Sequence, residues 1–328
     1  MANLSTRYMG LELRNPIIVG SSGLTATVEN IKTLEEKGAA AVVLKSLFEE
    51  QINFLINKTM SQDESVNAYP EAMDYISNYT RDNDVDNYLK LIREAKEAVK
   101  IPVIASINCI SSQEWTTFAR KMQDAGADGI ELNIFILPAD PKRNGEENEA
   151  VYFQIIEKVK KQVSIPVAIK ISHYFSGFAN TALKLSWTGI SGMVLFNRFF
   201  SPDIDIDKMK VTATHVFSTP EEIYNTLRWV ALLSDRLHCD IAASTGIHDG
   251  KAMIKQLLAG AKAVQIASVL YRHGFDSIPA MLKDLESWMD KQGFKSTSDF
   301  IGKMSIKEAQ NPAAYERVQF MKHFAGIE

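Results

Sequence analysis

Cysteine is scarce in this chain, whose 328 residues include only Cys109 and Cys239. Two cysteines far apart in the sequence cannot build a disulfide framework, and they supply too few thiolates for an iron–sulfur cluster or a cysteine-rich zinc site. The sequence therefore predicts no bound metal, and its low cysteine content is typical of a protein in a reducing cytoplasm.

Long apolar runs and an excess of one charge are also missing. Runs such as Ala39–Leu44 and Ile101–Ile107 have the length of strands and are too short to cross a bilayer, and residues 1–7 lack the apolar stretch of a signal peptide. The formal net charge is −4, from 36 basic and 40 acidic residues, which gives no field that attracts nucleic acid or an acidic membrane. We expect a cytoplasmic protein with a small-molecule partner, and no nucleic-acid or membrane partner.

The hydrophobic residues of the chain and their spacing indicate an α/β protein. Hydrophobic residues make up 46% of the chain, enough for a large core. Short runs rich in β-branched residues alternate with segments of helical periodicity, and this alternation indicates βαβ units around a parallel sheet. The runs are nearly continuously apolar, which predicts burial on both faces. The predicted strands are Pro16–Gly20, Ala40–Lys45, Pro102–Ile107, Gly129–Ile134, Pro166–Ile171, Gly192–Phe196, Asp240–Ala243 and Ala263–Ile266.

The residues between the runs favour a barrel. Gly38, Gly126 and Gly260 each stand where a helix would end in a left-handed cap and lead into a strand. Eight units, without a G-x-G-x-x-G motif after the first, favour a (β/α)8 TIM barrel over a doubly wound sheet. We predict a single barrel domain over residues 1–328. Glu49–Asp86 and Phe199–Pro220 exceed a minimal barrel. Their length and their place after strand ends are compatible with lids or substrate-binding walls, and equally with surface excursions or oligomer contacts.

Polar residues cluster at the predicted strand ends, where barrel enzymes place their chemistry. Two of the residues there are lysines, Lys45 and Lys170, and three are asparagines, Asn108, Asn133 and Asn197. Small residues follow the last two strands, and loops at these positions often bind phosphate through backbone N–H groups. The sequence therefore predicts a ligand that carries a phosphate.

Six motifs together resemble the dihydroorotate dehydrogenases, in order and spacing. They are Asn15-Pro16 with Ser21-Ser22-Gly23, Val43-Leu44-Lys45-Ser46, Glu131-Leu132-Asn133, Val167-Ala168-Ile169-Lys170, Ser244-Thr245-Gly246-Ile247, and Gly260-Ala261-Lys262-Ala263-Val264-Gln265-Ile266. The resemblance implies an oxidoreductase of pyrimidine biosynthesis that acts on CH–CH bonds, an FMN cofactor at the carboxyl ends of the strands, and a homodimer.

The resemblance also implies roles for individual residues. Lys45 and Lys170 would be catalytic, with Lys170 at the pyrimidine edge of the flavin, where a cation stabilises the charge that the ring gains with a hydride. Substrate would contact Asn67, Asn133 and Asn197. The cofactor would be bound by Ser21, Ser22, Gly23, Lys45, Ser46, Asn133, Lys170, Ser244, Thr245, Gly246, Ala267 and Ser268.

The chain departs from the family where the substrate proton is removed. The family reads Asn-Leu-Ser-Cys-Pro-Asn after the fourth strand, or Ser for Cys, whereas this chain reads Asn133-Ile134-Phe135-Ile136-Leu137-Pro138. An aliphatic side chain cannot accept a proton, and a general base typically supplies a factor of about 10²–10⁴ in rate. Cys109 and His173 are the candidates for a substitute. Phe217-Ser218-Thr219-Pro220 also replaces a glycine pair of the family at the expected phosphate site.

Three functions are compatible with these residues. The first is an FMN-dependent oxidoreductase that exchanges a hydride with a small, polar, dihydropyrimidine-like substrate. The second is a lyase or aldolase in which Lys170 forms a Schiff base. The third is a flavin-binding protein without turnover.

Overall fold

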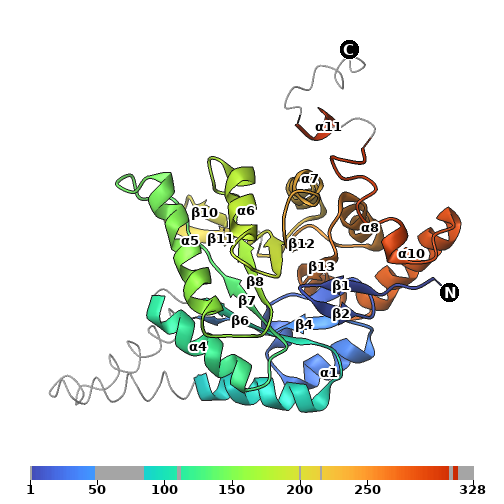
Figure 1. Ribbon diagram of the computed structural model, residues 1–328, viewed down its shortest axis with the longest axis horizontal. Helices are drawn as coiled ribbons and strands as arrows, with labels where there is room; N and C mark the ends of the chain where they lie inside the picture. Colours follow the sequence, from blue (N-terminus) through green and yellow to red (C-terminus); the bar gives the residue numbers. More distant parts are fainter. Residues whose placement is uncertain are drawn as a thin grey trace.

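Parallel strands form a closed barrel at the centre of the molecule, with helices around it (Figure 1). The computed structural model describes residues 2–48, 85–108, 112–198, 201–214, 216–309 and 313–316. The barrel strands are β3 (Ile17–Val19), β4 (Ala41–Val43), β6 (Val103–Asn108), β7 (Gly129–Asn133), β8 (Val167–Ile171), β9 (Gly192–Leu195), β12 (Asp240–Ser244) and β13 (Ala263–Ile266). Pairing of β4 with both β3 and β6 closes the ring. The (β/α)8 TIM barrel is confirmed, and each predicted strand overlaps an observed one.

The helices alternate with the strands along the chain. They are α1 (Val28–Glu36), α4 (Ser112–Asp124), α5 (Gly145–Lys160), α6 (Phe178–Ser186), α7 (Ile223–Leu233), α8 (Gly250–Ala259), α9 (Ser268–His273), α10 (Ser277–Gln292) and α11 (Ala313–Glu316), and residues 85–98 are also helical. Short 3₁₀ turns lie at η1 (Gly23–Thr25), η3 (Pro220–Glu222) and η4 (Thr297–Asp299). The predicted cap after α8 is present, because Gly260 has a φ of 116° and the chain turns from it into β13. No helix in the described part of the chain is long and apolar enough to cross a membrane.

A hairpin that the sequence interpretation missed closes the amino end of the barrel. Strands β1 (Thr6–Tyr8) and β2 (Leu11–Leu13) are antiparallel, and Met9 and Gly10 turn between them with positive φ angles of 46° and 85°. Tyr8 fits against the start of β9 so closely that a Cβ on Gly192 would lie 2.7 Å from its hydroxyl oxygen. Tyr8 and Met9 pack into the apolar interior of the barrel, so the hairpin fills the barrel at the amino ends of the strands.

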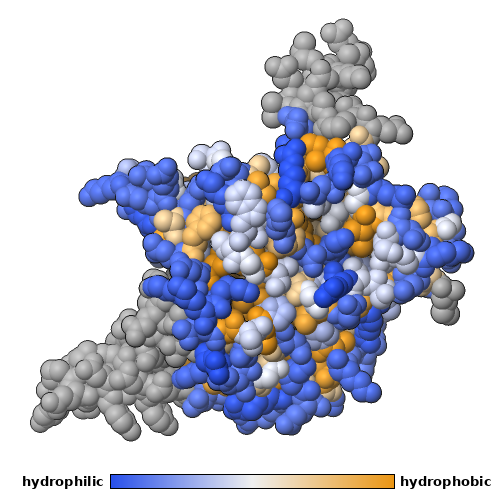
Figure 2. Space-filling model, viewed as in Figure 1, coloured by the Kyte–Doolittle hydropathy of each residue, from blue (hydrophilic) through white to orange (hydrophobic). Residues whose placement is uncertain are grey.

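A second hairpin accounts for most of the long segment after β9. Strands β10 (Ser201–Asp205) and β11 (Lys210–Thr214) pair antiparallel, with Ile204 opposite Val211, and both of these side chains are exposed. A short strand, β5 (Leu47–Phe48), adds to β6. Residues 49–84, which make up most of the other long segment, lie outside the described residues. On the face shown in Figure 2, hydrophilic residues surround smaller groups of apolar ones.

Candidate functional site

A cavity of about 370 Å³ lies at the carboxyl ends of the barrel strands. This volume falls within the range of small-molecule sites, roughly 300–1,000 Å³. Its lining includes Asn197 and every residue predicted to bind the cofactor: Ser21, Ser22, Gly23, Lys45, Ser46, Asn133, Lys170, Ser244, Thr245, Gly246, Ala267 and Ser268. The structure therefore brings together residues from distant parts of the sequence. Their contacts with a ligand stay a prediction.

The remaining predicted site residues are placed differently. Asn67 and Cys109 lie outside the described residues. His173 is described, but it is not one of the residues that line the cavity. Its ring stacks on Tyr174 and meets Phe196 edge-on, with ring centroids 4.6 and 5.5 Å apart, and Phe196 itself lines the cavity. Desolvation lowers the pKa of His173.

Two asparagine side chains hold each other in a fixed orientation at the cavity wall. Asn197 Nδ2 donates to the backbone oxygen of Lys170 at 3.0 Å and to Asn133 Oδ1 at 2.6 Å. Since a backbone carbonyl only accepts, Asn197 must turn its NH₂ group toward Lys170. Asn133 must then turn its oxygen toward Asn197. Asn133 Nδ2 and Asn197 Oδ1 are left as a donor and an acceptor for a ligand.

A polar chain crosses the barrel at the floor of the cavity. Lys170 Nζ on β8 donates to Gln265 Oε1 on β13 at 3.0 Å, and Gln265 Nε2 donates to Glu131 Oε2 on β7. Glu131 and Gln265 line the cavity, although the sequence interpretation gave them no role. A signal for them existed, because each is a polar residue inside an otherwise apolar strand. Gln265 is 3% exposed and Glu131 is 1% exposed, so both are cavity-floor residues shielded from solvent.

A row of serine hydroxyls lies beside this floor. Ser46 Oγ is 3.0 Å from Ser21 Oγ and 2.7 Å from Ser106 Oγ, and Ser106 is fully buried. The backbone N–H of Ser46 also donates to Ser21 Oγ. These contacts fix the loop that carries Lys45, whose side chain is exposed and lines the cavity.

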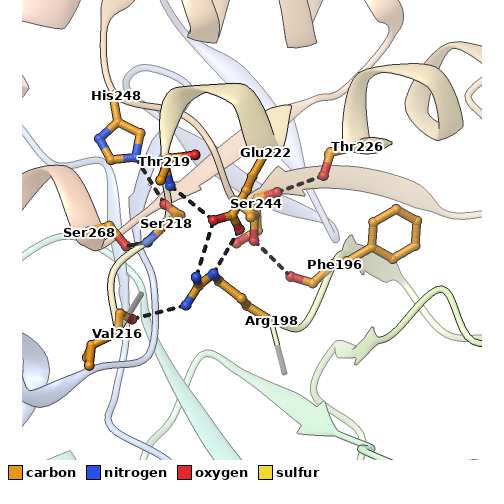
Figure 3. A network of polar contacts seen from close by, with 11 residues as sticks. Phe196, Arg198, Val216, Ser218, Thr219, Glu222, Thr226, Ser244, His248 and Ser268 are labelled. Atoms are coloured by element: carbon orange, nitrogen blue, oxygen red, sulfur yellow. Dashed lines mark hydrogen bonds and ion pairs between the residues drawn. The ribbon is translucent and has the colours of Figure 1, made fainter. Parts of the chain in front are cut away.

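The loops after β12 and β13 meet the segment that replaces the family's glycine pair (Figure 3). The Ser218 N–H donates to Ser268 Oγ at 3.0 Å, and Ser218 Oγ lies 3.0 Å from His248 Nε2. Thr245 has a φ of 77°, an uncommon angle for a residue other than glycine, and such angles concentrate at binding sites. Hydroxyl groups and loop backbone at this end of the cavity suit an anionic group.

Arg198 joins the end of β9 to the start of α7 on the other side of the same segment (Figure 3). Its Nε and Nη2 donate to the two carboxylate oxygens of Glu222 at 2.8 and 3.2 Å, and its Nη1 donates to the Val216 backbone oxygen. Bidentate, charge-assisted contacts of this kind are among the stronger hydrogen bonds in proteins, and they fix the relative orientation of the two side chains. Because Val216 and Glu222 lie on either side of Ser218 in the sequence, these contacts of Arg198 fix the position of Ser218 at the cavity wall.

The loop between β7 and α5 is apolar where the family has its base. Phe135 and Leu137 are exposed, and Ile136 lines a separate, neighbouring cavity of about 200 Å³ with Tyr152 and Tyr174. The Tyr152 hydroxyl is hydrogen-bonded to the backbone of Ile136, which anchors the loop. Residues 135–137 therefore present no proton acceptor to a ligand.

These residues fit FMN. The hydroxyl-rich end of the cavity, at Ser218 and Ser268, suits a phosphate. The floor supplies the Lys170 ammonium group and Glu131 Oε1, a buried acceptor with no hydrogen-bond partner among the described residues. A flavin ring has a polar edge that can satisfy such groups, and a buried acceptor without a partner is costly unless a ligand or water reaches it.

Comparisons with known proteins agree with this geometry. The family model described as dihydroorotate dehydrogenase matches residues 3–289. A Thermoplasma volcanium protein named dihydroorotate dehydrogenase B (NAD(+)), catalytic subunit, is 29% identical over 309 residues, which cover 92% of this chain and 98% of that protein. Proteins of the same name from Thermoplasma acidophilum and Methanocaldococcus jannaschii are 28% and 26% identical, over 92% and 88% of this chain and 99% and 94% of their own lengths.

Proposed function

Because the chain belongs to the dihydroorotate dehydrogenase family, we propose that it exchanges a hydride between FMN and a small cyclic amide of the dihydropyrimidine type. The family, its FMN cofactor and the class of oxidoreductases acting on CH–CH bonds were predicted from the resemblance, and all three are confirmed. The identity of the substrate and the roles of the site residues are the proposal.

The asparagine pair carries the substrate assignment. Asn133 Nδ2 offers a donor and Asn197 Oδ1 an acceptor, and the contacts with each other and with Lys170 prevent either amide from turning over. A ligand that satisfies both needs a carbonyl oxygen next to an N–H group. A ring amide provides this pair on one edge, and a dihydropyrimidine contains it.

The lysines supply the electrostatics of the reaction. When bound, FMN accepts or returns a hydride, and negative charge develops on its ring. The Lys170 ammonium group would stabilise that charge, since a cation fixed in place before the reaction need not reorganise. Lys45 faces the same cavity and would attract an anionic substituent of the substrate. Asn133 and Asn197 would orient the ring.

Proton transfer has to differ from the family's pattern. The substrate proton cannot be taken by residues 135–137, which are Phe, Ile and Leu. We propose that another group, such as Cys109 or His173, takes it, or that the natural substrate needs no base at this position. If a substitute group takes the proton, we expect this chain to oxidise dihydroorotate slowly. If the natural substrate needs no base at this position, we expect no oxidation of dihydroorotate.

The absorption spectrum of the purified protein tests the proposal. An oxidised-flavin spectrum is expected, either directly or after addition of FMN, with phosphate-free riboflavin as the control for the phosphate end of the cavity. Dihydroorotate and uncharged dihydropyrimidines are then added without oxygen, and bleaching of the flavin band is recorded. A protein that cannot be loaded with FMN would refute the proposal.

The two alternatives are tested by the same preparation. A Schiff base at Lys170 requires its Nζ to attack a carbonyl, whereas in the structure Nζ donates to Gln265 Oε1. Borohydride treatment with a carbonyl substrate would trap such an adduct, and a Lys170→Arg variant would not form it. A flavin that no dihydropyrimidine reduces, and that neither fumarate, NAD+ nor a quinone reoxidises, would favour a flavin-binding protein without turnover.

We also propose that the chain acts in the cytoplasm as one domain and as a homodimer. The apolar side chains on the β10–β11 hairpin, Ile204 and Val211 among them, offer one surface for self-association. Light scattering of the purified full chain measures its mass. A mass of one chain at micromolar concentration would refute the dimer.

A further inference from the structure

Gln265 lies between a cation and a carboxylate that come from other strands. Strand β13, which carries Gln265, is separated from β8 by β12 and β9 in the barrel. Its side chain therefore reaches across the barrel interior to contact Lys170, and it contacts Glu131 on β7 with its other end. The three side chains form the floor of the cavity, above the apolar interior.

The chemistry of the three groups fixes how Gln265 is oriented. An ammonium group only donates, so the atom of Gln265 that faces Lys170 must be its oxygen. The NH₂ group then faces Glu131, whose carboxylate only accepts. A reversed amide would place a donor against a donor and an acceptor against an acceptor. Glu131 thus holds Gln265, and Gln265 holds one hydrogen of the Lys170 ammonium group.

The Glu131 carboxylate at the end of these hydrogen bonds has an electrostatic effect on a ligand in the cavity. Glu131 is 1% exposed, so water screens its charge poorly. Its second oxygen, Oε1, has no hydrogen-bond partner among the described residues. A carboxylate behind Lys170 offsets part of the positive field that the ammonium group directs into the cavity.

We propose that Glu131 and Gln265 are positioning residues that aim the Lys170 ammonium group at the flavin and set the flavin's reduction potential. The proposal rests on the function proposed above, since it requires FMN in this cavity. Glu131 disfavours the reduced flavin, which carries more negative charge, and Lys170 favours it. The balance between them fixes the potential at which the enzyme exchanges a hydride.

Two isosteric variants of the FMN-loaded full chain test this. Glu131→Gln removes the charge but keeps the side-chain size. Against a redox dye of known potential, its ratio of reduced to oxidised flavin is expected to rise about tenfold, which is a shift of about +30 mV for a two-electron couple. The double variant Glu131→Gln with Gln265→Glu restores the net charge and puts the carboxylate directly against Lys170. Its potential is expected to fall below that of the wild type.

Asp128→Asn is the matched control. Asp128 precedes the amino end of β7, pairs with Lys96 at 2.7 Å and is not one of the residues that line the cavity. Its removal takes away the same charge just before the amino end of the same strand, outside the cavity, and no shift in potential is expected. Thermal unfolding of all variants separates electrostatic effects from loss of stability.

The outcomes separate this inference from the function on which it rests. If the Glu131→Gln variant binds FMN and its flavin has the same reduction potential as in the Asp128→Asn control, the inference is overturned and the proposed function still stands. If Glu131→Gln does not fold, the double variant decides, and an unchanged potential overturns the inference. A wild-type chain that cannot bind FMN overturns both.

Discussion

Asn197 donates a hydrogen bond to Asn133 across the cavity wall, with 2.6 Å between Nδ2 and Oδ1. Because this contact turns the oxygen of Asn133 toward Asn197, Asn133 offers its Nδ2 to a ligand as a donor. An Asn133→Asp variant keeps the acceptor for Asn197 but loses that donor. We expect kcat/KM for the best dihydropyrimidine to fall by about 10- to 100-fold, which corresponds to roughly 1.4–2.8 kcal/mol of transition-state stabilisation.

The FMN content of the same variant is the control for this prediction. Because Asn133 is also predicted to bind the cofactor, kcat/KM is calculated per bound FMN, so that a loss of cofactor is not counted as a loss of substrate contact. An Asn133→Asp variant with the kinetic constants of the wild type would show that the asparagine pair does not face the substrate.

The strands and this asparagine pair differ in how far the sequence could predict them. The barrel strands were predicted because their signals are local. Burial of a strand on both faces requires a nearly continuous apolar run, and Gly and Pro residues flank the runs. Asn133 was predicted from a motif, and Asn197 from its place at a strand end and from the family resemblance. The orientation of their amides, however, depends on the Lys170 backbone oxygen, which only the folded barrel brings to 3.0 Å from Asn197 Nδ2.

The polar floor shows the same limit more clearly. Gln265 and Glu131 both lie within motifs that carried the family resemblance, yet their sequence separation hides the contact across the barrel. The β1–β2 hairpin was missed for another reason. Its strands are three residues each, too short for periodicity to reveal, although the alternation Leu11-Glu12-Leu13 after Gly10 was a signal for it.

Replacement of Ile136 by serine tests the missing base. Ile136 occupies the position of the family's Cys or Ser when Asn133 is aligned. We expect Ile136→Ser to speed the reduction of bound flavin by dihydroorotate by about tenfold or more, up to the factor of about 10²–10⁴ that a general base supplies. Stopped-flow bleaching of the flavin band measures the rate. Leu137→Ser, one position later and exposed, is the control, and an equal gain in both variants would contradict the assignment.

The contact between Arg198 and Glu222 is expected to stabilise the segment at the hydroxyl-rich end of the cavity. The two side chains are 24% and 31% exposed, and Glu222 also accepts from the Thr219 N–H at 3.1 Å. We expect Glu222→Gln to lower the free energy of unfolding by about 1–2 kcal/mol, measured by urea denaturation. Glu157→Gln breaks an exposed pair with Lys161 and should cause no measurable change. Equal effects of the two variants would contradict the prediction.

Tyr8 and Tyr152 form a matched pair for stability. Both are 1% exposed, but the Tyr8 hydroxyl has no hydrogen-bond partner among the described residues, whereas that of Tyr152 bonds the Ile136 backbone and the Ser172 side chain. Burial raises the pKa of both phenols, so each stays neutral in the physiological range. We expect Tyr8→Phe to leave stability unchanged or raise it by up to about 1 kcal/mol, and Tyr152→Phe to lower it by about 1–2 kcal/mol. Thermal unfolding of the two variants measures this, and a loss in Tyr8→Phe as large as in Tyr152→Phe would show that the Tyr8 hydroxyl has a partner.

His248 should make the stability depend on pH. Desolvation, followed by the nearby Arg272 and His273, lowers the pKa of His248 below its ordinary value of 6.5. As the pH falls below about 6.5, the unfolded chain therefore binds a proton that the folded chain does not, and stability decreases. Above that pH both states are neutral at this residue and its contribution is constant.

A His248→Gln variant isolates this contribution. Glutamine can still bond Ser218 Oγ, which lies 3.0 Å from His248 Nε2 in the structure, but it does not titrate. We expect its free energy of unfolding to decrease less than that of the wild type between pH 7.5 and pH 5.5, measured by urea denaturation at each pH. Parallel curves for the two proteins would mean that His248 binds its proton equally well in the folded and unfolded chain. In that case Ser218 and the charges near it would have to accommodate an imidazolium beside the hydroxyl-rich end of the cavity, and protonation there would favour an anionic ligand.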